Sequence, residues 1–333
     1  MMTVGTPALN DAIKMLKIGA SKNDYPVYCQ YVMSKGNYAF TYNNEVFVRV
    51  DFPFPWRGSV NIYVLDETLR SLKDNAYNIE QVDDFLRITS GKFKSDIAIS
   101  SIVSDDEKIK PEIEYAILDK ETIESIMAAT KFVGGKIYQY IYVDTNNVIS
   151  TDTSSLFHAI TSLQVKTPFG ISKSIVPLLS EGVKIGVDKN NNVAVNFGTG
   201  YALFTTDSMA SYPKKNVMNF LESTTKNTTK VCNFAYIGEA LRYISPIFFG
   251  ENEKILTLRN DGRVLKVSAE TKVAGRADYE IVSEMGDAFE MRLDANKLKN
   301  ITYDYDMYIG DQSKVPSIIL DNTKATIIIV GED

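Results

Sequence analysis

The residues that could perform acid–base or nucleophilic chemistry are few and isolated in this sequence. His158 is the only histidine, and it lies in a strand-like segment, LFHAI. A single histidine rules out zinc motifs that need two, and no serine or cysteine occupies a nucleophile elbow or a triad motif. We therefore expect His158 to be structural, no residue to be catalytic, and the protein not to be an enzyme.

Segments that resemble ligand-binding loops are incomplete. Residues 198–200 (GTG) lack the third glycine and the following helix of a dinucleotide site, and no phosphate-binding loop with Gly-Lys-Ser/Thr occurs. Residues 188–192 (DKNNN) begin like a calcium loop, but Val193 stands where that loop requires glycine and Thr199 where it closes with glutamate. We predict no cofactor from these segments.

Two residue pairs could in principle bind a metal or form a disulfide. Asp304 and Asp306 are close carboxylates, which we interpret as part of a turn or strand edge. Cys29 and Cys232 lie far apart in the sequence and are interpreted as two small apolar residues. No metal site is predicted.

Composition and charge restrict the class of protein further. A chain of 333 residues that is 44% apolar and 23% charged suits two or three folded domains. No run of eighteen apolar residues predicts a membrane span, and residues 1–7 do not resemble a signal peptide, so we expect a cytoplasmic protein. The net charge of -6 argues against wrapping nucleic acid by bulk attraction, but it permits a positive charge confined to one face.

The chain repeats one pattern three times. Helical spacing of apolar residues predicts a first helix in each repeat, at residues 8–20, 119–131 and 236–245. A second helix is predicted at residues 66–74, 172–179 and 294–301. These second helices start at Asp66, Ser172 and Asp294, which are residue types that cap helices, and Pro177 either shortens or kinks the middle one.

Strand-like segments rich in β-branched and aromatic residues separate the predicted helices. In the first repeat they include residues 27–32, 38–52, 62–65 and 85–102. Helices packed on one face of antiparallel sheets define an α+β fold. The charged loop 104–111 and the polar stretch 222–230 then predict domains at residues 1–110, 111–224 and 225–333.

Four segments, in this order, carry a resemblance to a known family. They are VISTDTSSL (148–156), FTTDSMASYPKKNVM (204–218), VLKVSAETKVAGRADYEI (264–281) and ATIIIV (325–330). Along essentially the whole chain the sequence resembles the bacterial DNA polymerase III beta sliding clamp family. The resemblance implies three clamp domains per chain and a six-domain ring formed by two chains, head to tail.

The resemblance also implies three kinds of site. Helices that line the ring should present basic residues to duplex DNA without sequence specificity. The DNA-facing candidates are Lys14, Lys17, Lys22, Arg70, Lys73, Lys131, Lys136, Lys173, Arg242, Lys297 and Lys299. Candidates for the apolar pocket that would take short peptides of DNA polymerase and clamp loader are Thr151, Leu156, Pro213, Val217, Ile327 and Ile329. Ring-interface candidates are Ile97 and Ile99 on one side and Ile247 and Phe248 on the other.

Each set has an ordinary explanation as well. Lysines are common on solvated helix faces, acidic residues such as Glu121 and Glu239 share these helices, and the pocket and interface residues could be plain core. The chain also departs from the family, since Thr153-Ser154-Ser155 replaces Gly-His-Arg. We therefore predict that its partner motif differs from the common bacterial one.

A second class of protein fits the pattern. Repeated β-rich domains and 19 tyrosines would also suit a non-catalytic structural or carbohydrate-binding protein, because sugar sites use aromatic faces. A clamp should form a dimer with its helices inside a ring, whereas a sugar-binding protein should expose clustered tyrosines in a groove.

Overall fold

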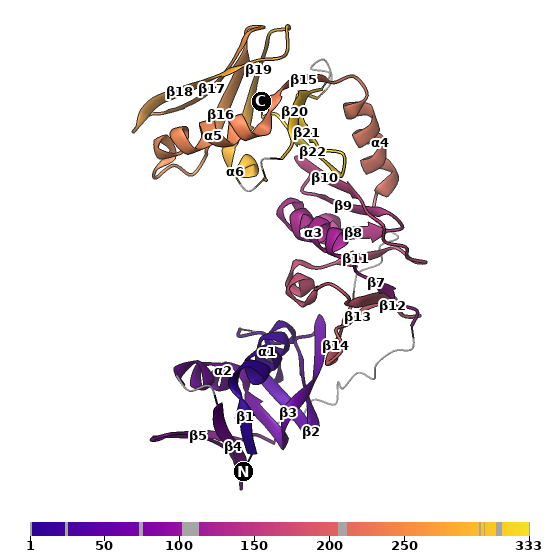
Figure 1. Ribbon diagram of the computed structural model, residues 1–333, viewed down its shortest axis with the longest axis vertical. Coiled ribbons are helices and arrows are strands. Elements are labelled where there is room, and N and C mark those ends of the chain that lie inside the picture. Colours follow the sequence, from indigo (N-terminus) through magenta and orange to yellow (C-terminus); the bar gives the residue numbers. More distant parts are fainter. Residues whose placement is uncertain are drawn as a thin grey trace. The chain divides into compact units, whose positions relative to one another are not determined.

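The structure is a computed structural model that describes residues 2–23, 26–72, 76–101, 113–205, 212–299, 301–302, 304–310 and 315–332 (Figure 1). The chain divides into two compact units. Unit 1 comprises Met1–Lys120 and Ser174–Ser208, and unit 2 comprises Glu121–Lys173 and Met209–Asp333. Each unit contains one large antiparallel sheet, one four-stranded sheet and a few short helices, so the expected α+β class is confirmed.

Unit 1 is built on two sheets. The four-stranded sheet has the order β1 (Met2–Gly5), β4 (Ala76–Val82), β5 (Phe85–Ser90), β6 (Phe93–Ala98). The six-stranded sheet has the order β2 (Tyr31–Tyr42), β3 (Val46–Asn61), β14 (Gly200–Thr205), β13 (Asn192–Asn196), β12 (Lys184–Val187), β7 (Ala116–Ile117). The helical segments are α1 (Thr6–Leu16), η1 (Lys17–Gly19), η2 (Val27–Gln30), α2 (Ile62–Ser71) and η5 (Lys173–Leu178), the last of which begins at the unit boundary.

Neighbouring side chains of β2 point to opposite faces of the six-stranded sheet, and their contacts show what covers each face. Thr41 Oγ1 donates a hydrogen bond of 2.6 Å to the Leu16 carbonyl, so α1 covers the face on which Thr41 lies. Phe40 points to the opposite face, where it packs with Phe47 and Tyr201 in an aromatic cluster. The core of unit 1 therefore lies on both faces of the six-stranded sheet.

Unit 2 repeats this plan. The eight-stranded sheet has the order β11 (Phe169–Ile171), β8 (Ile141–Asp144), β9 (Asn147–Thr151), β10 (Ser155–Ile160), β22 (Ala325–Val330), β21 (Ser317–Asp321), β20 (Asp306–Ile309), β15 (Thr229–Asn233). The four-stranded sheet has the order β18 (Gly275–Val282), β17 (Val264–Thr271), β16 (Ile255–Asn260), β19 (Phe289–Asp294). The helical segments are α3 (Lys120–Ala129), η3 (Thr130–Phe132), η4 (Lys136–Tyr138), α4 (Lys214–Thr225), α5 (Phe234–Ile244), η7 (Ser245–Phe248) and α6 (Ala295–Leu298).

Helices α3 and α4 cover opposite faces of the eight-stranded sheet (Figure 1). On the α3 side, Ser150 Oγ donates to the Ala129 carbonyl at 2.7 Å. On the α4 side, Leu156 belongs to the same core cluster as Val217 and Leu221. Because neighbouring strand residues point to opposite faces, β9 and β10 can serve both helices at once.

The internal repeat is visible in the order of the strands. The quartets β1-β4-β5-β6, β7-β12-β13-β14 and β15-β20-β21-β22 have the same arrangement, in which the strand before the first helix of a repeat joins the three strands that follow the second. The proposed domain limits remain a prediction, because residues of the expected second domain fall in both compact units.

Several predicted elements differ from those observed. Helix α2 starts at Ile62, four residues before the predicted cap Asp66, because the Asn61 side chain accepts hydrogen bonds from the amides of Tyr63 and Val64. Residues 62–65 are thus helical and not a strand. Residues 27–30 form the 3₁₀ helix η2 where a strand was predicted.

The other second helices are close to prediction. The segment that contains Pro177 is the 3₁₀ helix η5, in line with the expected effect of a proline. Asp294 caps α6 as predicted, since its carboxylate accepts a hydrogen bond of 2.8 Å from the Asn296 amide. Helix α4 was not predicted, and it covers the end of the segment 204–218 and the beginning of the polar stretch 222–230, which was assigned to a domain boundary.

The cap of α2 gives a test of this local structure. Asn61→Ala should lower the free energy of unfolding of unit 1 by about 1 kcal/mol, because two amides of the first turn lose their acceptor. The fluorescence of Trp56, the only tryptophan and a buried residue of β3, reports urea unfolding of this unit. The control Asn10→Ala, at an exposed position of α1, should leave the midpoint unchanged or slightly higher. An unshifted midpoint for Asn61→Ala would contradict the assignment.

Candidate functional site

A pocket opens in unit 2 between α4 and the junction of β10 with β22. Its volume is about 390 Å³, within the range of small-molecule and peptide-anchor sites. Its lining residues are Tyr138, Thr151, Thr153, Ser155, Leu156, Asn216, Val217, Phe220, Val315 and Val330. Aliphatic and aromatic walls with a few hydroxyl and amide groups suit an extended segment that carries apolar side chains.

Two elements supply most of the apolar wall. Val217 and Phe220 are three residues apart on α4 and therefore share one face of the helix. Leu156 faces them from β10, where it is paired with Thr151 of β9 and Ile328 of β22. Directly paired residues point to the same face of a sheet, so this face presents a continuous surface to α4.

The turn between β9 and β10, residues 151–155, forms the polar side of the pocket. Asp152 Oδ1 accepts hydrogen bonds from the amide and hydroxyl of Ser154, both at 3.0 Å, and from the amide and hydroxyl of Ser155, at 2.7 and 2.8 Å. Thr151 Oγ1 donates to the Ser155 carbonyl at 2.7 Å and accepts from the Thr153 amide at 3.1 Å. Thr153 has a φ of 80°, a left-handed conformation that this network stabilises.

The carboxylate of Asp152 is held in its charged form. Burial acts to raise its pKa, but the hydrogen bonds from Ser155 and Ser154 and the charge of Lys297 outweigh burial and lower the pKa below the ordinary value. Lys297 Nζ donates a hydrogen bond to Ser154 Oγ. A residue of α6 thus contacts the turn that lines the pocket.

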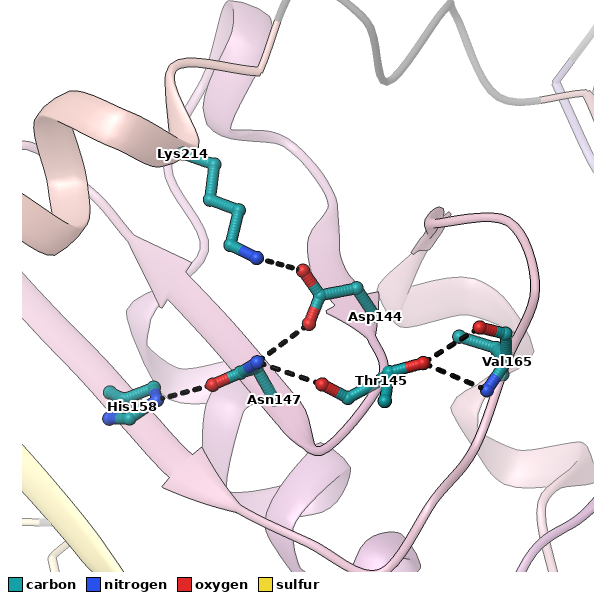
Figure 2. Close-up of polar contacts among 6 residues, drawn as sticks. All are labelled: Asp144, Thr145, Asn147, His158, Val165 and Lys214. Atoms are coloured by element: carbon teal, nitrogen blue, oxygen red, sulfur yellow. Dashed lines mark hydrogen bonds and ion pairs between the residues drawn. The ribbon is translucent and has the colours of Figure 1, made fainter.

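A second polar network anchors the beginning of α4 (Figure 2). Lys214, the first residue of the helix, pairs with the buried Asp144 at the end of β8. Asn147 Nδ2 donates to Asp144 Oδ1 at 2.7 Å and to the Thr145 carbonyl at 2.9 Å. Thr145 Oγ1 in turn donates to the Val165 carbonyl at 2.7 Å.

His158 completes this network. Its Nε2 lies 3.0 Å from Asn147 Oδ1, and because that oxygen can only accept, Nε2 carries the proton and donates it. Burial lowers the pKa of His158, the charge of Lys214 lowers it further, and Asp144 acts in the opposite direction. The imidazole is a neutral, hydrogen-bonded part of the sheet, which agrees with its predicted structural role.

The pocket contains half of the predicted peptide-binding residues. Thr151, Leu156 and Val217 line it, whereas Pro213 precedes α4 and lies outside the lining. Ile327 and Ile329 are buried and lie outside the lining: Ile327 is paired with Phe157, which stacks on Phe132 on the α3 side of the sheet, and Ile329, two residues later, shares that face. Alternation along β22 instead places Val330 in the pocket.

Sequence reasoning missed several lining residues. Phe220 would have followed from Val217 by helical spacing, had α4 been recognised. Val330 would have followed from the period of two along β22. Tyr138 and Val315 come from segments outside the quoted motifs, and no local pattern marked them.

The predicted DNA-facing residues have unequal surroundings. Most are exposed: Lys14, Lys22, Lys131, Lys136, Lys173, Arg242 and Lys299. Lys17 and Arg70 both pair with Asp66, the latter at 3.0 Å, so this trio carries a single net positive charge. Lys297 is half-buried against Ser154, and Lys73 lies outside the described residues.

The predicted interface residues are mostly covered within their own unit. Ile97 and Phe248 are each 6% exposed, and Ile99 and Ile247 are half-buried. Phe249, the next residue after η7, is 89% exposed. The exposed aromatic side chain at the end of η7 is therefore Phe249, and the role of Phe248 in an interface stays a prediction.

The remaining candidate ligands have structural partners. Asp188 caps a turn through the amides of Asn190 and Asn192, at 2.7 and 2.8 Å, and Asp306 pairs with Lys230 at 3.3 Å. Within the described part of the chain, no three His, Cys, Asp or Glu residues are grouped so that they could hold a metal ion. Both cysteines are buried thiols. None of the helices among the described residues is long and apolar enough to cross a bilayer.

The repeated α+β units with shared antiparallel sheets define the fold of the bacterial sliding clamps. The chain has the fold of the DNA polymerase III beta subunit: it superposes on that of Thermotoga maritima with a TM-score of 0.78 at 15% identity, covering 99% of this chain and 98% of the other. The Bacillus subtilis sliding clamp gives a TM-score of 0.79 at 13% identity, covering 99% and 98%. The Helicobacter pylori beta clamp bound to a DNA ligase peptide gives 0.74 at 12%, covering 100% and 99%. The sequence itself matches no protein-family model and no curated protein.

The lone histidine gives a pH test of the network at α4. The folded-state pKa of His158 is lowered from 6.5, so the stability contributed by its neutral form is complete above pH 6.5 and is lost as the pH falls below it. His158→Gln, which can still donate to Asn147, should flatten this decline. Thermal unfolding followed by circular dichroism at pH 7 and at pH 5.5 measures it. Parallel declines in the two proteins would show that His158 is not the titrating group.

Proposed function

We propose that this protein is a DNA sliding clamp, a non-enzymatic processivity factor that encircles duplex DNA and tethers replication proteins. The observation that carries the proposal is the clamp fold over the full chain, joined to an apolar pocket that contains Thr151, Leu156 and Val217 as the family resemblance predicts. Topological linkage to DNA needs no catalytic group and no tight contact. The expected location is the cytoplasm.

The internal repeat supports a ring of two chains. Two junctions between successive repeats are made alike: the last strand of a quartet pairs with an end strand of the preceding repeat, so that β14 pairs with β3 and β22 pairs with β10. Among the described strands, β6 has an unpaired side as the end of its quartet, and β18 has one at the position that corresponds to β10. In a head-to-tail dimer, the β6 edge of each copy would form backbone hydrogen bonds with the β18 edge of the other copy.

Exposed apolar residues near β18 fit this interface. Val282 lies on β18, Val273 lies at the turn that leads into it, and both are more than four-fifths exposed, as is Phe249. η7 packs against β17 and β18, which places Phe249 beside the same edge. We propose Phe249 as the interface side chain where Phe248 was predicted, and the β6–β18 edges as the backbone contact.

Weak, sequence-independent contact with DNA is proposed for the exposed basic residues of the helices and their ends. Lys22 and Lys17 both approach the ring of Tyr63, at 5.9 and 5.8 Å, which restrains their ammonium groups beside α2. Attraction of this kind to phosphates is screened by salt and allows the protein to move along the duplex. A net charge of -6 for the chain keeps this attraction local.

The proposed pocket ligand is a short extended peptide of a DNA polymerase or a clamp loader. Ser154 and Ser155 occupy positions where the family has His and Arg, and their hydroxyls are engaged by Asp152. The rim therefore offers no cationic side chain from this turn to an acidic or carbonyl-rich ligand. The partner motif is accordingly expected to rely on apolar anchors and to differ from the common bacterial motif.

The ring predicts a dimer in solution. Light scattering should give twice the chain mass of 37.2 kDa. Phe249→Asp should shift the mass towards one chain, because a carboxylate would be buried without a partner in the interface. Val64→Asp, at an exposed apolar position of α2, is the matched control and should remain dimeric. A trimer, or a dimer unaffected by Phe249→Asp, would contradict the proposed arrangement.

The pocket predicts peptide binding that depends on Phe220. Nonapeptides selected from a random displayed library on the wild-type chain serve as the probe, and fluorescence polarisation measures their affinity. Phe220→Ala should weaken binding about tenfold through loss of an aromatic wall. Asn219→Ala, its exposed neighbour on α4, should leave binding unchanged.

Two results would count against this proposal. One is equal binding by wild type and Phe220→Ala, which would place the peptide elsewhere. The other concerns the motif: tight binding of the Helicobacter pylori DNA ligase peptide would contradict the predicted difference from bacterial motifs.

A further inference from the structure

Lys297 was expected to face DNA, but its ammonium group contacts the pocket turn instead. It projects from α6, whose neighbouring residues Ala295 and Leu298 are buried and anchor the helix. Lys297 Nζ donates to Ser154 Oγ, and its charge acts on the carboxylate of Asp152. The side chain is half-buried, so it is shielded from solvent more than the exposed Lys299 two residues later.

The turn that Lys297 contacts depends on its surroundings for its conformation. Thr153 adopts a left-handed backbone conformation that a threonine does not favour. The Ser154 carbonyl accepts a hydrogen bond of 2.9 Å from the Val330 amide, and Gly134 approaches so closely that a Cβ there would lie 2.8 Å from Asp152 Cα. The turn is thus held from β22, from the η3–η4 connection and from α6.

Asp152 is the centre of this arrangement. Its Oδ1 accepts four hydrogen bonds from Ser154 and Ser155, and each of them is stronger when the carboxylate is charged. A half-buried carboxylate is costly without a nearby cation, and Lys297 supplies one. Removing that cation should weaken the whole set of bonds that gives residues 151–155 their shape.

We propose that Lys297 is a positioning residue of the peptide pocket, which holds the 151–155 turn in its binding conformation by contacting Ser154, whose amide and hydroxyl are bonded to Asp152. This inference rests on the proposed peptide-binding function. Three residues of the turn, Thr151, Thr153 and Ser155, line the pocket, so a looser turn would have to be ordered by the ligand at a cost in affinity. Lys297 is accordingly assigned to partner binding and not to DNA contact.

The test uses the full-length chain with two matched substitutions on one segment. Lys297→Met keeps the length of the side chain and removes its charge, and Lys299→Met does the same at an exposed position without a pocket contact. Affinity for the library-selected nonapeptide should fall about fivefold or more in Lys297→Met and stay unchanged in Lys299→Met. The salt dependence of duplex DNA binding should change in Lys299→Met only.

A readout without ligand separates positioning from a general loss of stability. Amide hydrogen exchange at Ser154 and Ser155 should accelerate in Lys297→Met, whereas amides in the centre of β10 should keep their protection. Asp152→Asn should also weaken peptide binding, and the double variant should lose less than the sum of the two single losses, because both act through one network.

The outcomes distinguish this inference from the proposed function. If Phe220→Ala weakens peptide binding but Lys297→Met changes neither affinity nor amide exchange, the positioning role is overturned while the pocket assignment stands. If no selected peptide depends on Phe220, the peptide-binding function itself fails. If Lys297→Met alters DNA binding and not peptide binding, Lys297 is a DNA contact, as its place on a helix first indicated.

Discussion

Backbone hydrogen bonding between edge strands of successive repeats is the constraint on which the rest of this structure depends. A strand at the edge of a sheet presents a row of unpaired N–H and C=O groups, which must be covered or paired. Here β14 pairs with β3 and β22 pairs with β10, so two such edges are satisfied inside the chain. The pocket is a product of the second junction, since Leu156 and Val330 approach it from the two strands that meet there.

Because successive side chains along a strand point to opposite faces, the eight-stranded sheet packs against different helices on its two faces. Ser150 and Phe157 face α3 and η3, while their neighbours Ile149 and Leu156 face α4. Helix α4 is fastened at its beginning by Lys214 and Asp144 and packs its later residues on the apolar cluster. The ion pair between Lys214 and Asp144 fixes the start of the helix, and Val217 and Phe220 further along it form one wall of the pocket.

Much of the architecture could be predicted from the sequence, because it rests on periodic patterns. The first helix of each repeat follows from apolar residues at helical spacing over about ten residues, and most strands follow from short runs of β-branched and aromatic residues. The features that were not predicted depend on contacts that form only in the folded chain. Asn61 caps α2 by geometry that only the folded chain shows, and helix α4 begins after a proline in a segment with many polar residues. Ile327 and Ile329 were taken from the correct strand but the wrong face, since the sequence does not show which side of a fully apolar strand meets a helix. Lys297 could not be placed because its partners are more than 140 residues away in the sequence.

The buried cysteines described above have a practical consequence for spectroscopy. Cys29 and Cys232 are almost inaccessible to solvent, so a thiol reagent cannot readily reach either sulfur, and burial also raises the pKa of Cys232 to about 12. Maleimide dyes or spin labels should therefore react only with a cysteine introduced on the surface. Single-molecule distance measurements between the open edges β6 and β18 can thus be made in the natural cysteine background.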